Sequence, residues 1–127
     1  MIFDTDILIW MHRGHLGAAQ FVNRVPIEER NLSAISYLEL LYGVRDGSDL
    51  RAVRTMVADL FAEIVPIDET ISGLAIHVLE SYVLAHGLDA SDALIAATAL
   101  DRRETLATGN GKHFRFILGL DLKIFRP

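Results

Sequence analysis

Two carboxylates interrupt an apolar run at the start of the chain. Asp4 and Asp6 stand in MIFDTDILIW, among isoleucine, leucine, phenylalanine and tryptophan. An ionised carboxylate in apolar surroundings costs free energy unless a partner compensates it. That partner can be the free N–H groups that open a helix, which Asp binds as an N-cap, or a metal ion. Both interpretations apply to this pair, and for Asp6 the helix cap is favoured.

Two further acids carry the same ambiguity. Glu39 lies in SYLELLYG, where Ser36-x-x-Glu39 matches a capping box. Asp92 opens DALIAATAL, where the helix dipole favours an acidic residue, and Asp89 and Ser91 are alternative caps. Helix capping therefore explains each acid taken alone.

The elements around these acids follow from the apolar pattern. Strands are predicted at residues 1–5, at the start of 30–36, and at 62–68, 105–109 and 121–125; helices at 7–11, 16–25, 36–44, 50–62, 71–83 and 89–103. Gly43 or Gly47 is expected to end the third helix, and Gly87 the fifth. This alternation predicts an α/β fold with three layers, in which helices cover both faces of a parallel sheet of about four to five short strands.

The placement of the acids relative to these elements is more informative than each acid alone. Asp4, Glu39 and Asp92 each come at or just past a predicted strand end, or at the start of a helix, where parallel sheets place their ligand crevice. Carboxylates that converge there repel one another unless a divalent cation neutralises them. Oxygen ligands and the absence of cysteine favour Mg²⁺ or Mn²⁺ over Zn²⁺.

Composition restricts the remaining possibilities. The 127 residues are 51% hydrophobic and 23% charged, which is typical of a folded chain, and we expect a single domain over 1–127. No apolar run has the roughly 20 residues of a membrane helix, and no secretion signal is evident, so a cytoplasmic protein without membrane contact is expected. The net charge of −5 gives no general electrostatic argument for nucleic-acid binding.

Four segments, taken in order, resemble the motifs of PIN-domain ribonucleases, in particular the VapC-like toxins of type II toxin–antitoxin systems. They are FDTDILIW, SYLELLYG, DALIAATA and TGNGKHF, and they extend over most of the chain. The resemblance places the first three acids of the family on Asp4, Glu39 and Asp92, and the hydroxyl that often follows the first acid on Thr5. The fourth acidic position falls on Asn110, where many relatives have Asp.

The resemblance implies a PIN-like fold and metal-dependent hydrolysis of RNA phosphodiester bonds. Asp4, Asp92 and Glu39 would hold Mg²⁺ or Mn²⁺, directly or through water. Asn110 would complete the catalytic set through its carbonyl oxygen, although it brings no charge. Accessory positions are Thr5, Asp6, Thr108 and Lys112.

The resemblance also implies partners. These are an RNA substrate, a cognate antitoxin protein and a second copy of the chain in a homodimer. Arg102, Arg103 and Lys112 are the preferred substrate contacts, because they lie near the third and fourth motifs in the sequence. The apolar helices at 37–44 and 50–61 are candidate docking surfaces.

Two other functions compete with this one. The D-T-D segment also resembles the D-x-D motif of haloacid-dehalogenase-like phosphatases, with Asp4 as nucleophile and Asp6 as general acid. That motif usually continues to Thr or Val where this chain has Leu8, and neither lysine is well placed for such an enzyme. The second alternative is a catalytically inactive PIN-like module that binds RNA or a protein, which the uncharged Asn110 would permit.

Overall fold

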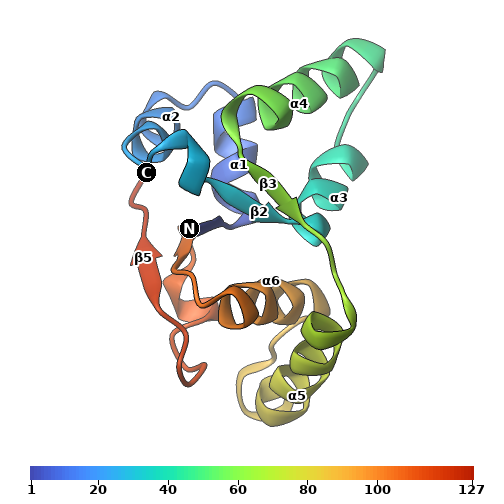
Figure 1. The fold of residues 1–127 in the computed structure, drawn as a ribbon, viewed down its shortest axis with the longest axis vertical. Helices are drawn as coiled ribbons and strands as arrows, with labels where there is room; N and C mark the ends of the chain where they lie inside the picture. Colours follow the sequence, from blue (N-terminus) through green and yellow to red (C-terminus); the bar gives the residue numbers. More distant parts are fainter.

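A five-stranded parallel sheet forms the centre of the protein. The computed structural model describes residues 1–127, and the strand order is β3-β2-β1-β4-β5 (Figure 1). The strands are β1 (Ile2–Phe3), β2 (Asn31–Ser33), β3 (Glu63–Val65), β4 (Leu106–Thr108) and β5 (Leu122–Ile124). All neighbouring strands are parallel, so the predicted α/β fold with a short-stranded parallel sheet is confirmed.

Six helices surround the sheet. They are α1 (Thr5–His12), α2 (Leu16–Asn23), α3 (Ala34–Tyr42), α4 (Gly47–Leu60), α5 (Glu69–His86) and α6 (Ala90–Arg102). Two 3₁₀ turns, η1 (Ile27–Glu29) and η2 (Gly111–His113), were not expected from the sequence. No helix has both the length and the apolar character required to span a bilayer.

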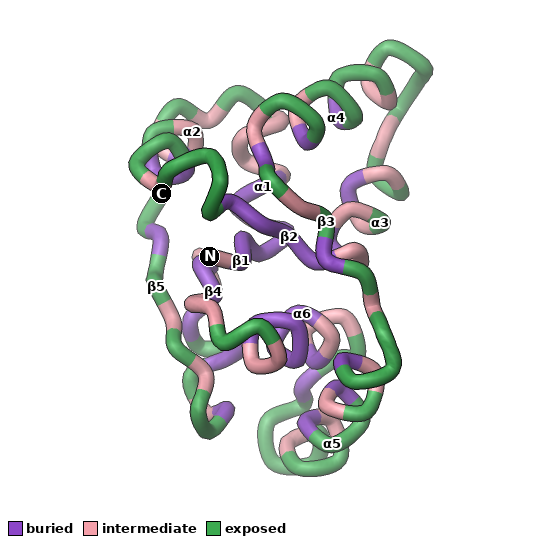
Figure 2. Tube along the Cα trace, viewed as in Figure 1, coloured by how far each residue is buried: buried purple, intermediate pink, exposed green.

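The sheet separates two hydrophobic clusters. Because successive strand residues point to opposite faces, Ile2 and Leu106 pack with α5 and α6, whereas Phe3 and Ala107 pack with the helices α1 to α4. Figure 1 shows α5 and α6 on one side of the sheet and α1 to α4 on the other. The strands β1, β2 and β4 are buried throughout, in contrast to the outer faces of the helices (Figure 2). The three-layer arrangement is therefore confirmed.

Glycines end two helices as predicted. Gly43 is the C-cap of α3, and Gly47 begins α4 instead of ending α3. Gly87 closes α5 with a φ of 62°, in the left-handed region that glycine adopts without steric cost.

The strand order reverses at β1. The chain places β2 and β3 on one side of β1 and then crosses to build β4 and β5 on the other. A crevice at the carboxyl ends of β1 and β4 is the expected ligand site of such a sheet. Asp4 directly follows β1, and Thr108 is the last residue of β4.

Candidate active site

Asp4 is the buried carboxylate at this switch point. Its side chain is held from both sides: Oδ1 accepts a hydrogen bond from the Thr5 backbone N–H at 2.7 Å, and Oδ2 accepts one from Thr108 Oγ1, also at 2.7 Å. The residue is only 5% exposed. Burial, together with the neighbouring charge of Asp6, raises the pKa of Asp4 to about 7 despite these bonds. An ionised Asp4 is therefore costly unless a cation offsets it.

The prediction that Asp6 caps the first helix is wrong. Helix α1 begins at Thr5, so Asp4 is the N-cap and Asp6 lies within the first turn. Asp6 Oδ1 accepts from the Ile7 N–H at 2.7 Å, while Oδ2 accepts from the Gly109 N–H at 3.0 Å and from Asn110 Nδ2 at 3.2 Å. Asp6 thus connects α1 to the segment that follows β4, and burial raises its pKa.

The capping-box interpretation of Glu39 is also wrong. The N-cap of α3 is Ser33, whose Oγ accepts from the Ile35 N–H at 3.3 Å. Glu39 therefore lies beyond the first turn of α3. Its Oε1 accepts a hydrogen bond from Thr5 Oγ1 at 2.8 Å, and the buried Ser36 hydroxyl lies 2.9 Å from the same Thr5 oxygen.

Ser36 was not recognised as a site residue from the sequence. A signal existed, because a residue three positions before Glu39 on a helix lies on the same face. Thr5, Ser36 and Glu39 form one hydrogen-bonded group that ties the start of α1 to the middle of α3.

Asp92 approaches from the start of α6. Asp89 is the N-cap of this helix and accepts from the Asp92 N–H at 2.7 Å, which settles the choice among the rival caps. Burial is the main cause that raises the pKa of Asp92 to about 6, and the charges of Asp89 and Glu39 act in the same direction. His113 Nδ1 lies 3.5 Å from Asp92 Oδ2. His113 was not among the site residues predicted from the sequence.

Asn110 lies beside the carboxylates without contributing a charge. Its backbone N–H donates to Thr108 Oγ1 at 3.0 Å, and its side-chain amide donates to Asp6. Lys112 follows in η2 and is exposed.

The expected ligands do not form a closed cluster. The structure contains no group of three or more Asp, Glu or His side chains arranged to hold a metal ion. Asp4 and Asp92 are nevertheless close enough for the charge of Asp92 to raise the pKa of Asp4. Mg²⁺ is commonly held by one or two carboxylates and keeps several waters. The carboxylates of Asp4 and Asp92, whose pKa values are both raised, fit such an ion.

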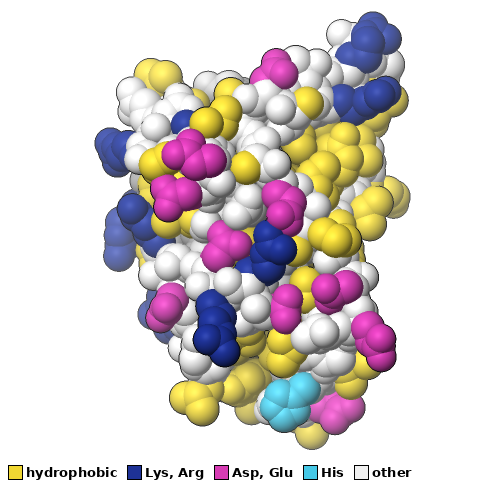
Figure 3. Space-filling model, viewed as in Figure 1, with side chains coloured by type: hydrophobic (Ala, Val, Ile, Leu, Met, Phe, Trp, Pro, Cys, Tyr) yellow, Lys and Arg dark blue, Asp and Glu magenta, His cyan; other side chains and the backbone are white.

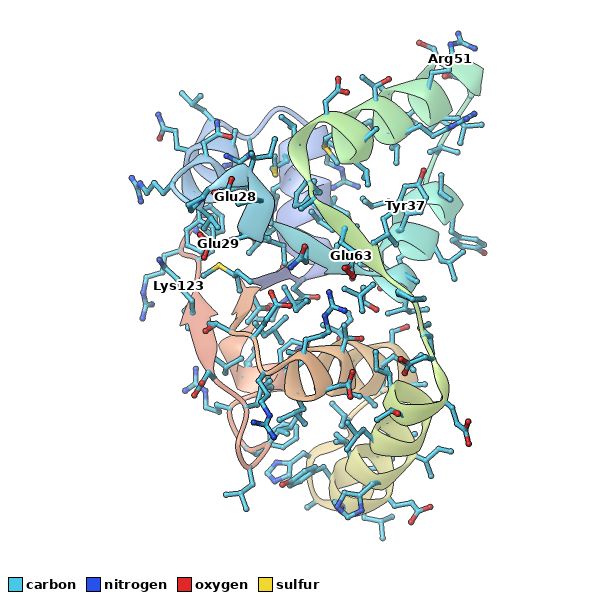
Figure 4. All side chains as sticks on the ribbon, in the orientation of Figure 1. Glu28, Glu29, Tyr37, Arg51, Glu63 and Lys123 are labelled. Atoms are coloured by element: carbon cyan, nitrogen blue, oxygen red, sulfur yellow. The ribbon has the colours of Figure 1, made fainter.

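Arg102 does not lie near Asp92. It ends α6, and the ten residues from Asp92 correspond to roughly 15 Å of helix. Its Nη2 contacts both carboxylate oxygens of Glu63 at 2.6 Å, at the start of β3. Figure 4 shows Glu63 pointing from β3 toward α6. Arg102 therefore lies at the opposite end of α6 from Asp92, and the adjacent Arg103 caps the same helix end.

A groove extends from Glu39 between α1, α3 and α4. It has a volume of about 510 Å³, and its polar lining includes Arg13, Arg45, His12 and Asp49. His12 Nε2 and Asp49 Oδ1 are 2.6 Å apart. Next to this groove, α3 exposes Leu38 and Tyr42, the latter to 94%. Hydrophobic side chains gather over this part of the surface (Figure 3).

Comparison with known proteins identifies the family. Residues 1–117 match the PIN domain. The chain is similar to a toxin–antitoxin complex from Klebsiella pneumoniae, with 28% identity, 94% of this chain and 93% of the other covered, and a TM-score of 0.79. It is also similar to FitAcB from Neisseria gonorrhoeae, with 25% identity, 95% and 94% covered, and a TM-score of 0.72.

A third structure shares the fold. VapBC2 from Rickettsia felis, bound to a DNA fragment from their promoter, is 20% identical over 99% of this chain and 100% of the other, with a TM-score of 0.81. No curated protein matches the sequence. The match over residues 1–117 confirms the resemblance read from the four motifs, and the chain belongs to the PIN-domain family.

Proposed function

We propose that the protein is a metal-dependent endoribonuclease and the toxin of a toxin–antitoxin pair. The observation that carries the proposal is the burial of Asp4 at the switch point of the sheet, with Asp92, near the start of α6, close enough for its charge to raise the pKa of Asp4. Two carboxylates whose ionised forms are both disfavoured indicate a place where a cation is expected to bind. Membership of the PIN-domain family supports the same function.

Each residue of the proposed site has a distinct role. Asp4 and Asp92 would hold Mg²⁺ or Mn²⁺, and Glu39 would complete the set directly or through water. When bound, the ion supplies positive charge at the scissile phosphate and lowers the pKa of a coordinated water. Thr108 fixes the Asp4 carboxylate, and Thr5 fixes that of Glu39.

Glu39 is the preferred proton acceptor for the attacking water. It is oriented by the hydrogen bond from Thr5, and it faces the groove between α1, α3 and α4. A general base needs both a fixed position and access to the water it deprotonates. Asn110 would orient a water or a phosphate oxygen, and Lys112 would contact the phosphate backbone.

An antitoxin is the proposed protein partner. Structures similar to this chain include a toxin–antitoxin complex. The exposed Leu38 and Tyr42 on α3 offer an apolar surface for docking. Helix α4 is less suited, because its apolar Val53 and Val57 are buried in the core. We also propose a homodimer, which light scattering on the purified protein would test.

Expression in cells tests the toxin assignment. Induction of the wild-type chain should arrest growth and produce new RNA 5′ ends, whereas Asp92→Asn should do neither. Co-expression with the neighbouring open reading frame should relieve the arrest and yield a stable complex. A folded wild-type protein that binds RNA but leaves RNA ends and growth unchanged would instead indicate the catalytically inactive PIN-like module.

A further inference from the structure

Asp6 accepts more hydrogen bonds from the segment after β4 than from its own helix. Its Oδ2 accepts hydrogen bonds from the Gly109 N–H at 3.0 Å and from Asn110 Nδ2 at 3.2 Å, across 103 and 104 positions of sequence. Its Oδ1 accepts only from the adjacent Ile7 N–H. A carboxylate that merely stabilised the first turn of α1 would not need the two distant donors.

The backbone at Gly109 is shaped to admit this carboxylate. A Cβ atom at residue 109 would lie 2.8 Å from Asp6 Oδ2 and 2.7 Å from the Trp10 ring. Both separations are too short for a side chain, so the close approach requires glycine. The contact between Asp6 and the Gly109 N–H therefore depends on a specific residue at each end.

Asp4 and Asp6, at the start of α1, together hold three consecutive residues after the middle of β4, residues 108 to 110. Asp4 accepts from Thr108 Oγ1, which in turn accepts from the Asn110 N–H at 3.0 Å. Asp6 accepts from Gly109 and from the Asn110 side chain. The two carboxyl groups are also direct neighbours, and the charge of Asp6 adds to the cost of ionising Asp4.

Asn110 fits this arrangement because it is a neutral donor. An ionised carboxylate only accepts hydrogen bonds, so the group that Asn110 presents to Asp6 is its NH₂. An aspartate at 110 would place two carboxylates at about the same separation and would repel Asp6. Three of the roughly four acceptor positions of Asp6 are occupied by these donors, and the Asp4 carboxyl is a further hydrogen-bond partner that lowers the pKa of Asp6.

We propose that Asp6 and Asn110 act as one unit, in which Asp6 supplies negative charge that strengthens cation binding at Asp4 and Asp92 and Asn110 holds it in place. Asp6 is thus a positioning residue outside the ligand set. The inference rests on the proposed metal-dependent function. It explains why the segment carries an amide at 110, since the charge required there comes from α1.

Mn²⁺ titration of the metal-free protein by calorimetry tests the proposal without any activity measurement. Asp6→Asn should weaken Mn²⁺ binding about tenfold or more, because partners outside the ligand set typically contribute 10- to 100-fold. Asn110→Asp should lower the midpoint of thermal unfolding in EDTA, since it places two carboxylates together. Asp68→Asn, at the N-cap of the distant helix α5, is the matched control and should change neither quantity appreciably.

The exchanged pair Asp6→Asn with Asn110→Asp is the decisive variant. It restores one charge and one amide, so its Mn²⁺ affinity should return to within about threefold of wild type, with one hydrogen bond of modest net worth lost. If Asp6→Asn alone fails to fold, the Mn²⁺ affinity of the exchanged pair still tests the proposal. An exchanged pair that is unfolded, or folded with a tenfold loss of affinity, contradicts the proposal.

Two results separate this inference from the function on which it rests. Wild-type protein that binds no Mn²⁺ would contradict the metal-dependent function itself. Tight Mn²⁺ binding by wild type and equally tight binding by Asp6→Asn would contradict only the role of Asp6.

Discussion

The hydroxyl of Thr108, at the end of β4, donates a hydrogen bond to the carboxylate of Asp4, at the end of β1, over 2.7 Å. Both residues are buried, and the bond joins the two strands between which the sheet order reverses. It also lowers the pKa of Asp4, against the larger effect of burial. Thr108 therefore helps to keep Asp4 ionised.

Removing this hydroxyl should shift the acid limb of the activity profile. Thr108→Val keeps the shape of the side chain but deletes the donor, so the pKa of Asp4 should rise further. The pH–rate profile for RNA cleavage should then require a higher pH to reach its plateau. Thr108→Ser should keep the wild-type profile, as should Thr70→Val at an exposed position on α5. A Thr108→Val profile that coincides with wild type would contradict this role.

The metal-free protein should lose stability as pH rises from about 4 to about 7. Burial and like charges raise the pKa of Asp4 to about 7 and that of Asp92 to about 6, from 3.8 in the unfolded chain. Between these values the folded state binds more protons, so the free energy of unfolding falls with increasing pH and levels off above pH 7. Urea denaturation in EDTA measures this trend, and Asp4→Asn should show a smaller decline. Parallel curves for the two proteins would argue against a buried, ionisable Asp4.

Arg102 and Lys112 should differ in their effect on RNA binding. Arg102 pairs with Glu63 at the amino edge of the sheet, so Arg102→Ala should leave RNA affinity unchanged. It should cost about 0–1 kcal/mol of stability, as is usual for exposed ion pairs. Lys112→Ala should weaken RNA binding and reduce its salt dependence. Equal losses of affinity in the two variants, measured by fluorescence anisotropy, would contradict this assignment.

Phe3 should be the most sensitive apolar position next to the site. It is fully buried, and its ring makes edge contacts with Phe21 and Phe61 at centroid distances of 6.3 and 5.9 Å. Phe3→Ala should lower the free energy of unfolding by about 3–5 kcal/mol, the usual cost of such a cavity. Phe116→Ala, at a partly buried position, is a milder comparison. A loss of about 1 kcal/mol or less at Phe3 would be inconsistent with the packing described.

The architecture could be predicted because the spacing of apolar residues along the sequence indicates strands and helices without any knowledge of tertiary contacts. The alternation of short apolar strands with amphipathic helices was sufficient for a parallel sheet covered on both faces. It also predicted that Asp4 lies at the carboxyl end of the first strand, where the structure has it. The family could be recognised because its motifs keep their order along the chain.

What the sequence could not predict depends on boundaries and distant contacts. The first strand has only two residues, so an error of two positions moved the N-cap from Asp4 to Asp6. Ser36 matched a capping-box motif with Glu39, but Ser33, three residues earlier, is the cap that the structure uses. The bond between Asp6 and Asn110 joins residues 104 positions apart and leaves no local signal. Arg102 was expected near Asp92 because the two are close in the sequence, but the length of helix α6 separates them.

The measurement that tests the central claim most directly is RNA cleavage by metal-stripped protein with Mg²⁺ or Mn²⁺ restored. Wild type should cleave only after the metal is added, and Asp4→Asn should lose activity by about 100-fold or more while keeping its fold, since even partners outside the ligand set contribute 10- to 100-fold. Glu28→Gln, at an exposed position in η1, should cleave like wild type. Cleavage that persists in EDTA, or that is undiminished in folded Asp4→Asn, would contradict a metal-dependent site built on Asp4.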